Sequence, residues 1–459
     1  MADDAWVTGL EAEMANATLG DPRLSRRLGQ IIGQLARRPG MSFPKVFDSA
    51  ALEAAYRFFG NAAVAPAGIL SGHLEATRKR SVEAARVLAV HDTTTLTFRV
   101  DGQRRGLGRL MSTGQSFYAH TSLVLKADGT RLPLGIAALA TWVRTDAPAP
   151  SERLRWAEQV QAAEECLRDV AHVIHVMDRE ADDYSLFSRL LANGNHFIVR
   201  GRHDRLLEGH GEKKVHQAIA RIERSVEREV PVSKRVDGQR APIQKRIHPS
   251  RKARLAKLQI GATRLTIKRP TTVDAPIAET VTLNLVRVWE PDPPPGEAPI
   301  EWALWTTEPI DTPEDLAAIV DSYRARWTIE ELFKALKTGC AYEARQLEDY
   351  EGLVNALAVF LPIACQLLEL RTEARRVPDA PAATVLTETH LLVLRALGRR
   401  PLPAAPTVRD ALLAVAALGG HIKYSGDPGW LTLARGLSEL LSLTRGWEAA
   451  QLQLRRDQT

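Results

Sequence analysis

The chain has 459 residues, 45% of them hydrophobic, which is enough to bury a large core in about two to four domains. Its three cysteines (Cys166, Cys340 and Cys365) are far apart, which argues against a disulfide framework or a thiolate zinc site and favours a reducing cytosol. The amino terminus lacks a signal pattern, no apolar run approaches the roughly 20 residues of a membrane span, and a net charge of +6 is only a mild bias towards polyanions.

The first 80 residues are predicted to form short helices. Thr18-Leu-Gly-Asp-Pro22 provides a capped start, and apolar residues then recur at helical spacing from Leu24 to Leu35. Basic residues occupy the other positions, and a solvated helix face is the simplest interpretation of this segment taken alone. These residues are Arg23, Arg26, Arg27, Arg37 and Arg38.

Strands are expected from Val87 onwards. The first strand is expected over 87–90 and leads to Asp92. Two more are expected over 120–126 and 134–142, on either side of an Asp128-Gly129 hairpin signal. Together these three strands predict an antiparallel meander. A helix over 151–170, a strand over 173–177 ending at Asp178, a helix to about 192 and a strand over 197–199 follow. Antiparallel strands followed by strands that alternate with helices predict a mixed sheet with helices on both faces.

An inserted β subdomain is predicted between about residues 202 and 298. Its expected strands are 226–232, 254–260, 264–267 and 281–288, and a proline-rich linker over 291–295 precedes a strand over 300–307. The run 234–257 holds nine basic residues and the single acid Asp237, and is interpreted as either a phosphate clamp or a disordered solubilising loop.

A helix is expected to begin at Thr312, followed by Pro313 and by Asp315 as a capping partner. If it continues unbroken to Gly339, one polar stripe contains Tyr323, Arg326, Glu330 and Lys337, because a helix turns about 100° per residue. A second capping pattern, Thr328 with Glu331, leaves open a break that would separate the first two residues from the others. Beyond about residue 370, a leucine- and alanine-rich sequence predicts a separate helical module.

Three acids are candidate metal ligands. Asp92 and Asp178 lie at or just past the ends of apolar strands, and Glu330 lies on a helix. Magnesium takes oxygen ligands, and two such ions can activate a water or a 3′ hydroxyl and stabilise the leaving oxygen of a phosphodiester. The alternatives are a turn former for Asp92, a helix cap for Asp178 and an exposed ion pair with Lys334 or Lys337 for Glu330.

The chain resembles the insertion-sequence-four transposases, a family of DDE transposases. The resemblance rests on Asp92-Thr-Thr-Thr-Leu96, on Asp178-Arg-Glu-Ala-Asp182, and on the spacing of Tyr323, Arg326, Glu330 and Lys337. It extends almost end to end, from Leu19-Gly-Asp-Pro22 and Ala55-Tyr-Arg-Phe58 to Arg326-Trp-Thr-Ile-Glu330. The basic pattern of the first helices and the carboxy-terminal module match the family only loosely, so its end-sequence specificity does not carry over.

The resemblance implies an RNase H-like α/β catalytic core in which Asp92, Asp178 and Glu330 bind two Mg²⁺ ions, or Mn²⁺. It implies cut-and-paste transposition: nicking, hairpin formation, hairpin opening and insertion into target DNA. It also implies a homodimer on transposon-end DNA, in the cytoplasm of a prokaryote and associated with the nucleoid. The domains expected are 1–70 (helical, DNA-binding), 71–370 (catalytic, with the insertion at about 202–298) and 371–459 (helical, dimerising).

DNA contacts are assigned to further residues. Tyr323, Arg326 and Lys337 match family positions that hold a phosphate, a task suited to hydrogen-bond donors and a point charge. Trp302 matches a tryptophan that stacks on a flipped base, although a core tryptophan is the alternative, with Trp305 and Trp327 nearby in the sequence. The remaining expected contacts are Arg200, Arg26, Arg27, Lys334 and Trp327.

Two other functions fit the same residues. A metal nuclease or resolvase would share the core without strand transfer, and a catalytically decayed copy or transposition inhibitor would keep only DNA binding and dimerisation. The presence of all three acids argues against decay.

Overall fold

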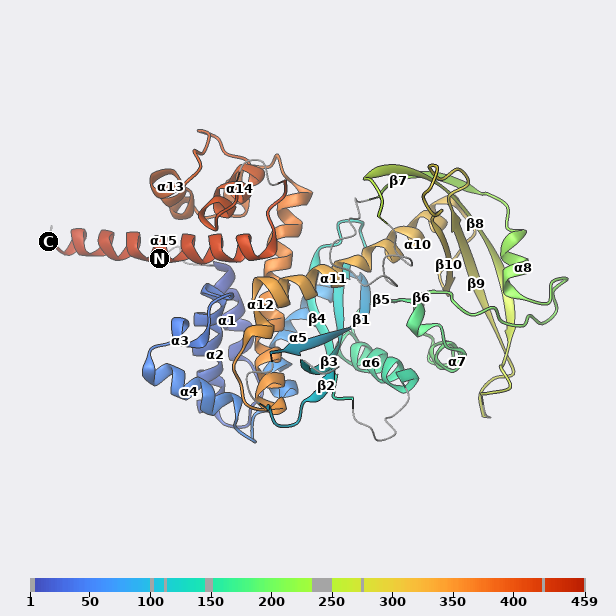
Figure 1. Cartoon of the computed structure of the whole chain (residues 1–459), viewed down its shortest axis with the longest axis horizontal. Coiled ribbons are helices and arrows are strands. Elements are labelled where there is room, and N and C mark those ends of the chain that lie inside the picture. Colours follow the sequence, from blue (N-terminus) through green and yellow to red (C-terminus); the bar gives the residue numbers. More distant parts are fainter. Residues whose placement is uncertain are drawn as a thin grey trace. The chain divides into compact units, whose positions relative to one another are not determined.

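The computed structural model describes residues 5–99, 103–110, 114–144, 152–232, 250–273, 276–422 and 426–457. It contains two compact units (Figure 1). Unit 1 comprises Met1–Ala149, Ala162–Ala171 and Trp327–Thr459, and unit 2 comprises Pro150–Gln161 and His172–Arg326. The three-domain division expected from the sequence stays a prediction.

The amino-terminal part of unit 1 is helical, as predicted. Its helices are α1 (Ala5–Ala15), α2 (Pro22–Arg37), α3 (Phe43–Val46), α4 (Ser49–Phe59) and α5 (Pro66–Ala84). Asp21 caps α2 by accepting a hydrogen bond from the Arg23 backbone N–H at 2.8 Å, and Pro22 occupies the first turn. Leu28, Ile31 and Leu35 are buried, so the predicted helical spacing does mark the inner face.

The strands of unit 1 form the predicted meander with one short addition. They are β1 (Arg86–Phe98), β2 (Gly108–Leu110), β3 (Gly114–Lys126) and β4 (Pro133–Trp142), and β3 pairs antiparallel with the other three. Gly129 takes φ +85 in the turn between β3 and β4, a conformation that glycine adopts without strain. The expectation that a strand ends near Asp92 was wrong: β1 continues to Phe98, and Asp92 pairs with Thr121 inside it.

Helix α12 (Tyr350–Arg376) lies at the core of unit 1 and contacts α4 and α5. It corrects the expectation that no apolar run approaches membrane-spanning length, because its length and composition pass that test. However, 83% of the most apolar 18-residue stretch of this helix is buried, which is typical of a core helix. The carboxy-terminal helices α13 (Glu388–Leu397), α14 (Val408–Leu418) and α15 (Trp430–Asp457) follow it, in agreement with the predicted helical module.

Unit 2 contains a mixed sheet of six strands in the order β5-β6-β10-β9-β8-β7 (Figure 1). β5 and β6 are parallel, and every other neighbouring pair is antiparallel. The strands are β5 (His172–Met177), β6 (His196–Arg200), β7 (Val226–Val232), β8 (Arg254–Lys268), β9 (Thr280–Trp289) and β10 (Glu301–Thr306).

The strands of the predicted insertion therefore extend this sheet through β9 and β10. Residues 233–249, which hold most of the predicted basic run, lie outside the described residues. Arg254, from the same run, lies in β8 rather than in a loop, and its guanidinium binds Glu290 and Glu297. At least this part of the basic run is structural.

The helices of unit 2 pack against its sheet and complete the core. They are α6 (Glu152–Cys166, whose first part belongs to this unit), α7 (Tyr184–Ala192), α8 (Val215–Ala220) and α10 (Pro313–Ala325). The core contains stacked Phe187 and Phe197, with ring centroids 5.6 Å apart, and the buried Trp305. The capping box predicted for α10 is confirmed: Thr312 and Asp315 each bind the other's backbone N–H, at 3.1 and 3.0 Å.

The helical segment from Thr312 to Gly339 is not one α-helix. α10 ends at Ala325, α11 (Trp327–Lys334) begins after Arg326, and residues Ala335–Gly339 form a π-helix, η2. The break lies at Arg326, two residues before Thr328, where the sequence offers a second helix cap as an alternative. Tyr323 therefore belongs to α10, Glu330 to α11 and Lys337 to the π-helix, and the single polar stripe over 323–337 stays a prediction.

Candidate active site

Two predicted residues, Asp178 and Arg200, meet at one edge of the unit 2 sheet, by which we mean the side where β5 and β6 end. Because β5 and β6 are parallel and Met177 pairs with Val199, Asp178, just past β5, and Arg200, the last residue of β6, lie side by side where these strands end. Asp178 begins the short 3₁₀-helix η1 (Arg179–Ala181), and its Oδ1 accepts a hydrogen bond from the Glu180 N–H at 2.8 Å. The cap alternative is thus true of Asp178, and its partly exposed carboxylate keeps further lone pairs for an ion.

Tyr323, on α10, lies near Asp178 and Arg200. Its side chain is 7% exposed, and the Arg200 guanidinium lies close enough to act on the pKa of its phenol. Burial raises the pKa of Tyr323, the neighbouring Arg200 and Arg326 oppose the shift, and Asp178 adds to it. A phenol is protonated near neutral pH even at its ordinary pKa of about 10, so Tyr323 is a hydrogen-bond donor.

Trp302 completes what we call the Tyr323 cluster. Its ring meets that of Tyr323 edge to face, with centroids 5.7 Å apart and an interplanar angle of 60°. Trp302 is partly exposed on β10, whereas Trp305 is 1% exposed in the core, so the core alternative describes Trp305 and not Trp302. The cluster consists of Asp178, Arg200, Trp302, Tyr323 and Arg326.

Unit 1 holds the other two predicted acids on elements that touch. Asp92 lies in β1, and its Oδ1 accepts a hydrogen bond from the Thr93 N–H at 2.8 Å. Glu330 lies in the first turn of α11, a helix that contacts β1. Both side chains are partly exposed. The turn-former alternative for Asp92 is wrong, because Asp92 lies inside a strand.

Lys337 connects the π-helix to the same strand. Its Nζ donates a hydrogen bond to the Thr95 carbonyl at 2.6 Å and lies 3.7 Å from Glu343. An ammonium has three donors, so these contacts leave it able to reach an anion as well. π-Helical turns occur frequently at functional sites, which gives this one-turn deviation significance.

Lys334 and Trp327 lie on the exposed side of α11. Lys334 forms an ion pair with Glu331 at 2.7 Å, and its Nζ lies 5.8 Å from the centre of the Trp327 ring, which is 56% exposed. Glu331 also binds Arg371 of α12 at 2.9 Å and the Trp430 indole N–H of α15 at 3.2 Å. Burial raises the pKa of Glu331, and these three donors outweigh it to leave the pKa lowered. The role of Glu331 is therefore structural.

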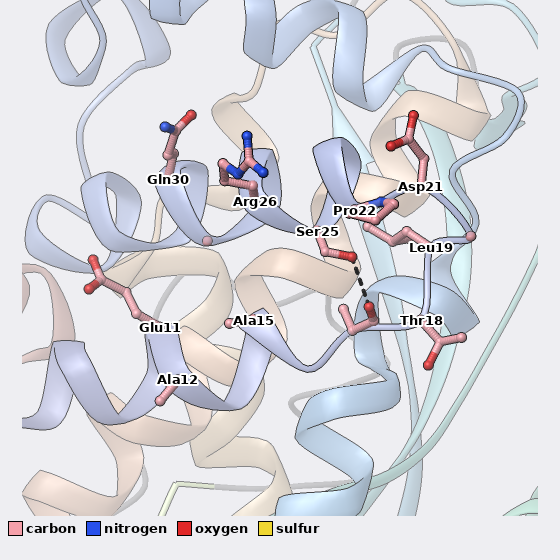
Figure 2. A pocket seen from close by; sticks show the side chains of 13 residues that line it. Glu11, Ala12, Ala15, Thr18, Leu19, Asp21, Pro22, Ser25, Arg26 and Gln30 are labelled. Carbon is pink, nitrogen blue, oxygen red and sulfur yellow. Dashed lines mark hydrogen bonds between the residues drawn. The ribbon is translucent and has the colours of Figure 1, made fainter.

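Arg26 and Arg27 are in α2. Arg26 is exposed and borders an open hollow of 970 Å³ between α1 and α2 (Figure 2). Ser25 lies at this hollow, where its hydroxyl donates to the Ala17 carbonyl at 3.0 Å. Arg27 is partly exposed.

Sequence reasoning missed the role of Asp182, the last residue of the Asp178-Arg-Glu-Ala-Asp182 motif. Its carboxylate is fully buried, accepts hydrogen bonds from the Arg202 and His203 N–H groups at 2.5 and 2.8 Å, and pairs with Arg205. It thereby fixes the chain that follows Arg200. Nothing in the local sequence distinguishes this anchor from a metal ligand, because its partners are about 20 residues downstream.

Two parts of the chain match known families. Residues 4–64 match the family described as Transposase DNA-binding, and residues 157–361 match the Transposase DDE domain. The second match contains Asp178 and Glu330, whereas Asp92 precedes it; the first contains Arg26 and Arg27. The chain therefore contains a transposase DNA-binding domain and a transposase DDE domain, which support a DDE transposase, and the mixed sheet of unit 2 fits an RNase H-like core.

Proposed function

We propose that this transposase moves DNA by cut and paste, with Asp92, Asp178 and Glu330 as ligands for two Mg²⁺ ions, for which Mn²⁺ can substitute. The donor chemistry fits, since all three side chains offer carboxylate oxygens that are partly exposed. When bound, the ions supply activation of a water or a 3′ hydroxyl and stabilisation of the leaving oxygen. The assignment to the insertion-sequence-four family belongs to the same proposal and rests on the motifs.

The observation that carries the proposal is the Tyr323 cluster. It places two guanidinium groups and a protonated phenol beside a carboxylate at the end of a parallel strand pair. Arginine binds phosphate through directional, charge-assisted hydrogen bonds, and tyrosine adds a neutral donor. We assign Arg200, Tyr323 and Arg326 to the phosphate next to the transposon terminus.

Trp302 provides the aromatic surface that hairpin formation requires. A tight DNA end costs base stacking, and stacking on an aromatic side chain restores about 1–3 kcal/mol per base. In the proposed sequence, a nick frees a 3′ hydroxyl, which attacks the opposite strand and leaves a hairpin on the transposon end. Water then opens the hairpin, and the 3′ hydroxyl attacks target DNA, so each step exchanges one phosphodiester bond for another or for a hydrolysed end.

Further contacts complete the proposed DNA interface. Lys337, Lys334 and Trp327 extend it in unit 1, and Arg26 and Arg27 act in the amino-terminal domain that matches a DNA-binding family. We assign dimerisation to residues 371–459. Three apolar side chains of α15 support this assignment, since Trp447, Leu452 and Leu454 are 38%, 53% and 53% exposed.

The test begins with the inverted repeats that flank the gene, because these are the expected substrates. Purified protein with Mg²⁺ should convert pre-nicked ends into hairpins and then join opened ends to a target plasmid. Arg200→Lys, which keeps the charge but loses the planar fork, should bind these ends more weakly than the wild type.

Two outcomes would contradict the proposal. Cleavage without hairpins or joined products would identify a metal nuclease or resolvase. Specific binding to the ends with no cleavage under Mg²⁺ or Mn²⁺ would identify an inhibitory or decayed copy.

A further inference from the structure

A second group of polar side chains lies at the opposite edge of the unit 2 sheet from Asp178. His172 begins β5, His196 begins β6, and Glu308 follows the end of β10. Since β5 and β6 are parallel and β10 is antiparallel to β6, these three positions meet at one edge. Six residues of strand separate His172 from Asp178, a distance of about 20 Å.

The three side chains converge on one point. His172 Nε2 lies 3.2 Å from Glu308 Oε2, and His196 Nδ1 lies 3.0 Å from Glu308 Oε1. The two imidazole rings have centroids 4.2 Å apart. One donor atom from each residue lies within 4.8 Å of the other two.

Burial makes this arrangement costly without a cation. Glu308 is 3% exposed, and a carboxylate removed from water requires a cationic partner or strong hydrogen-bond donors. His196 Nδ1 is also shielded from solvent, and among the described residues it has no hydrogen bond, although it lies 3.0 Å from a carboxylate oxygen. His172 Nε2, by contrast, is hydrogen-bonded to Glu308 Oε2, so His196 Nδ1 is the ring nitrogen whose lone pair is available to a cation.

Hydrogen bonds to its backbone hold Glu308 in place. Its backbone N–H donates to the Thr306 hydroxyl at 3.0 Å, and its carbonyl accepts from the Asn284 amide at 2.8 Å. Asn284 in turn accepts a hydrogen bond from Arg264 at 3.1 Å. These contacts fix the backbone of Glu308 and so limit the positions that its carboxylate can take.

We propose that His172, His196 and Glu308 bind one divalent transition-metal ion, with zinc as the best match. Two imidazole nitrogens and one carboxylate oxygen are a known zinc ligand set, whereas Mg²⁺ takes oxygen ligands. The two imidazoles approach different oxygens of the Glu308 carboxylate, at 3.2 and 3.0 Å, and one donor atom from each residue lies within 4.8 Å of the other two. A bound zinc ion would draw these atoms towards the roughly 3.3 Å that separates tetrahedral ligands at zinc bond lengths. A fourth position remains for water. The ion joins the starts of β5 and β6 to the end of β10, and it is distinct from the proposed magnesium site.

The test uses full-length protein without an affinity tag, stripped with a chelator and dialysed against buffered zinc. We expect one zinc ion per chain, and a zinc affinity at least about tenfold lower in His172→Ala, His196→Ala and Glu308→Gln, because loss of even a supporting contact costs 10–100-fold. Two controls should bind zinc as the wild type does. His216→Ala removes another histidine of unit 2 that pairs with a carboxylate, Asp204, and Asp178→Ala removes an acid at the far edge.

A second measurement needs no variant. Zinc should raise the melting temperature of the stripped wild-type protein, and Mg²⁺ at the same concentration should not. The proposal is overturned if the wild type binds no zinc, if Asp178→Ala or His216→Ala loses zinc as strongly as the three ligand variants, or if zinc leaves the melting temperature unchanged.

Discussion

Replacing Asp182 with alanine tests whether the two outer acids of the Asp178-Arg-Glu-Ala-Asp182 motif have different roles. The change deletes a buried carboxylate that accepts hydrogen bonds from the Arg202 and His203 N–H groups. It also removes the carboxylate that pairs with the Arg205 guanidinium, whose side chain is only 6% exposed. Asp182→Ala should therefore act on the stability of unit 2.

The magnitude follows from these contacts. Removing one partner of a buried ion pair costs about 3–5 kcal/mol, because the other charge stays buried and uncompensated. Each 1 kcal/mol lowers the melting temperature of a domain of about 150–250 residues by roughly 2–4 °C. The expected fall is therefore on the order of 10 °C. Asp182→Asn should lose less, since an amide oxygen still accepts from the backbone donors.

Asp178→Ala is the matched comparison within the same motif. In the structure its carboxylate accepts one hydrogen bond at the start of η1, and loss of such a cap costs about 1 kcal/mol. If Asp178 holds metal, this variant should melt within a few degrees of the wild type, bind transposon ends nearly as well, and cleave nothing.

Two measurements separate the residues: thermal unfolding followed by circular dichroism, and cleavage of end DNA at 20 °C, where both variants remain folded. Asp182→Ala should show the large thermal shift with residual cleavage, and Asp178→Ala should show the reverse. The reasoning fails if Asp182→Ala melts like the wild type, or if Asp178→Ala loses end binding as fully as it loses cleavage.

Three further predictions concern single side chains. Trp302→Ala should leave first-strand nicking and block hairpin formation, and normal hairpin yields on sequencing gels would exclude the stacking role. Lys337→Ala should reduce the salt slope of DNA binding by about one unit, since one phosphate contact is lost; an unchanged slope would confine Lys337 to its bond with Thr95. Burial lowers the pKa of His120 from 6.5 to about 3, so between these pH values the unfolded chain binds a proton that the folded chain does not. Stability should fall as the pH drops below 6.5, and in His120→Asn that fall should be shallower by up to about 1.4 kcal/mol per pH unit in urea titrations.

Local signals in the sequence predicted most elements correctly. The strand over 226–232 and the Thr312 capping box are confirmed, because each depends on neighbouring residues alone. The gathering of Arg200, Trp302 and Tyr323 on neighbouring elements was implied by the family resemblance. No periodicity in the sequence brings together residues more than 100 positions apart.

The errors share a physical cause, which is tertiary context. The sequence predicts that a strand ends near Asp92, yet Thr93, Thr94 and Thr95 are β-branched and extend β1 against β3. The helix break at Arg326 carries no glycine or proline, and it coincides with the boundary between the two units. The anchoring role of Asp182 likewise depends on partners far along the chain.

The two edges of the unit 2 sheet differ in donor chemistry, and this difference makes their roles separable. At the Asp178 edge a carboxylate lies beside guanidinium and phenol groups, a set suited to a hard ion and a phosphate. At the other edge two imidazoles and a buried carboxylate suit a softer ion. β5 joins the edges through a six-residue strand, so an ion at His172 can act on Asp178 only by keeping that strand in place. Glu308→Gln should therefore lower the temperature at which cleavage is lost and leave the cleavage rate well below that temperature unchanged.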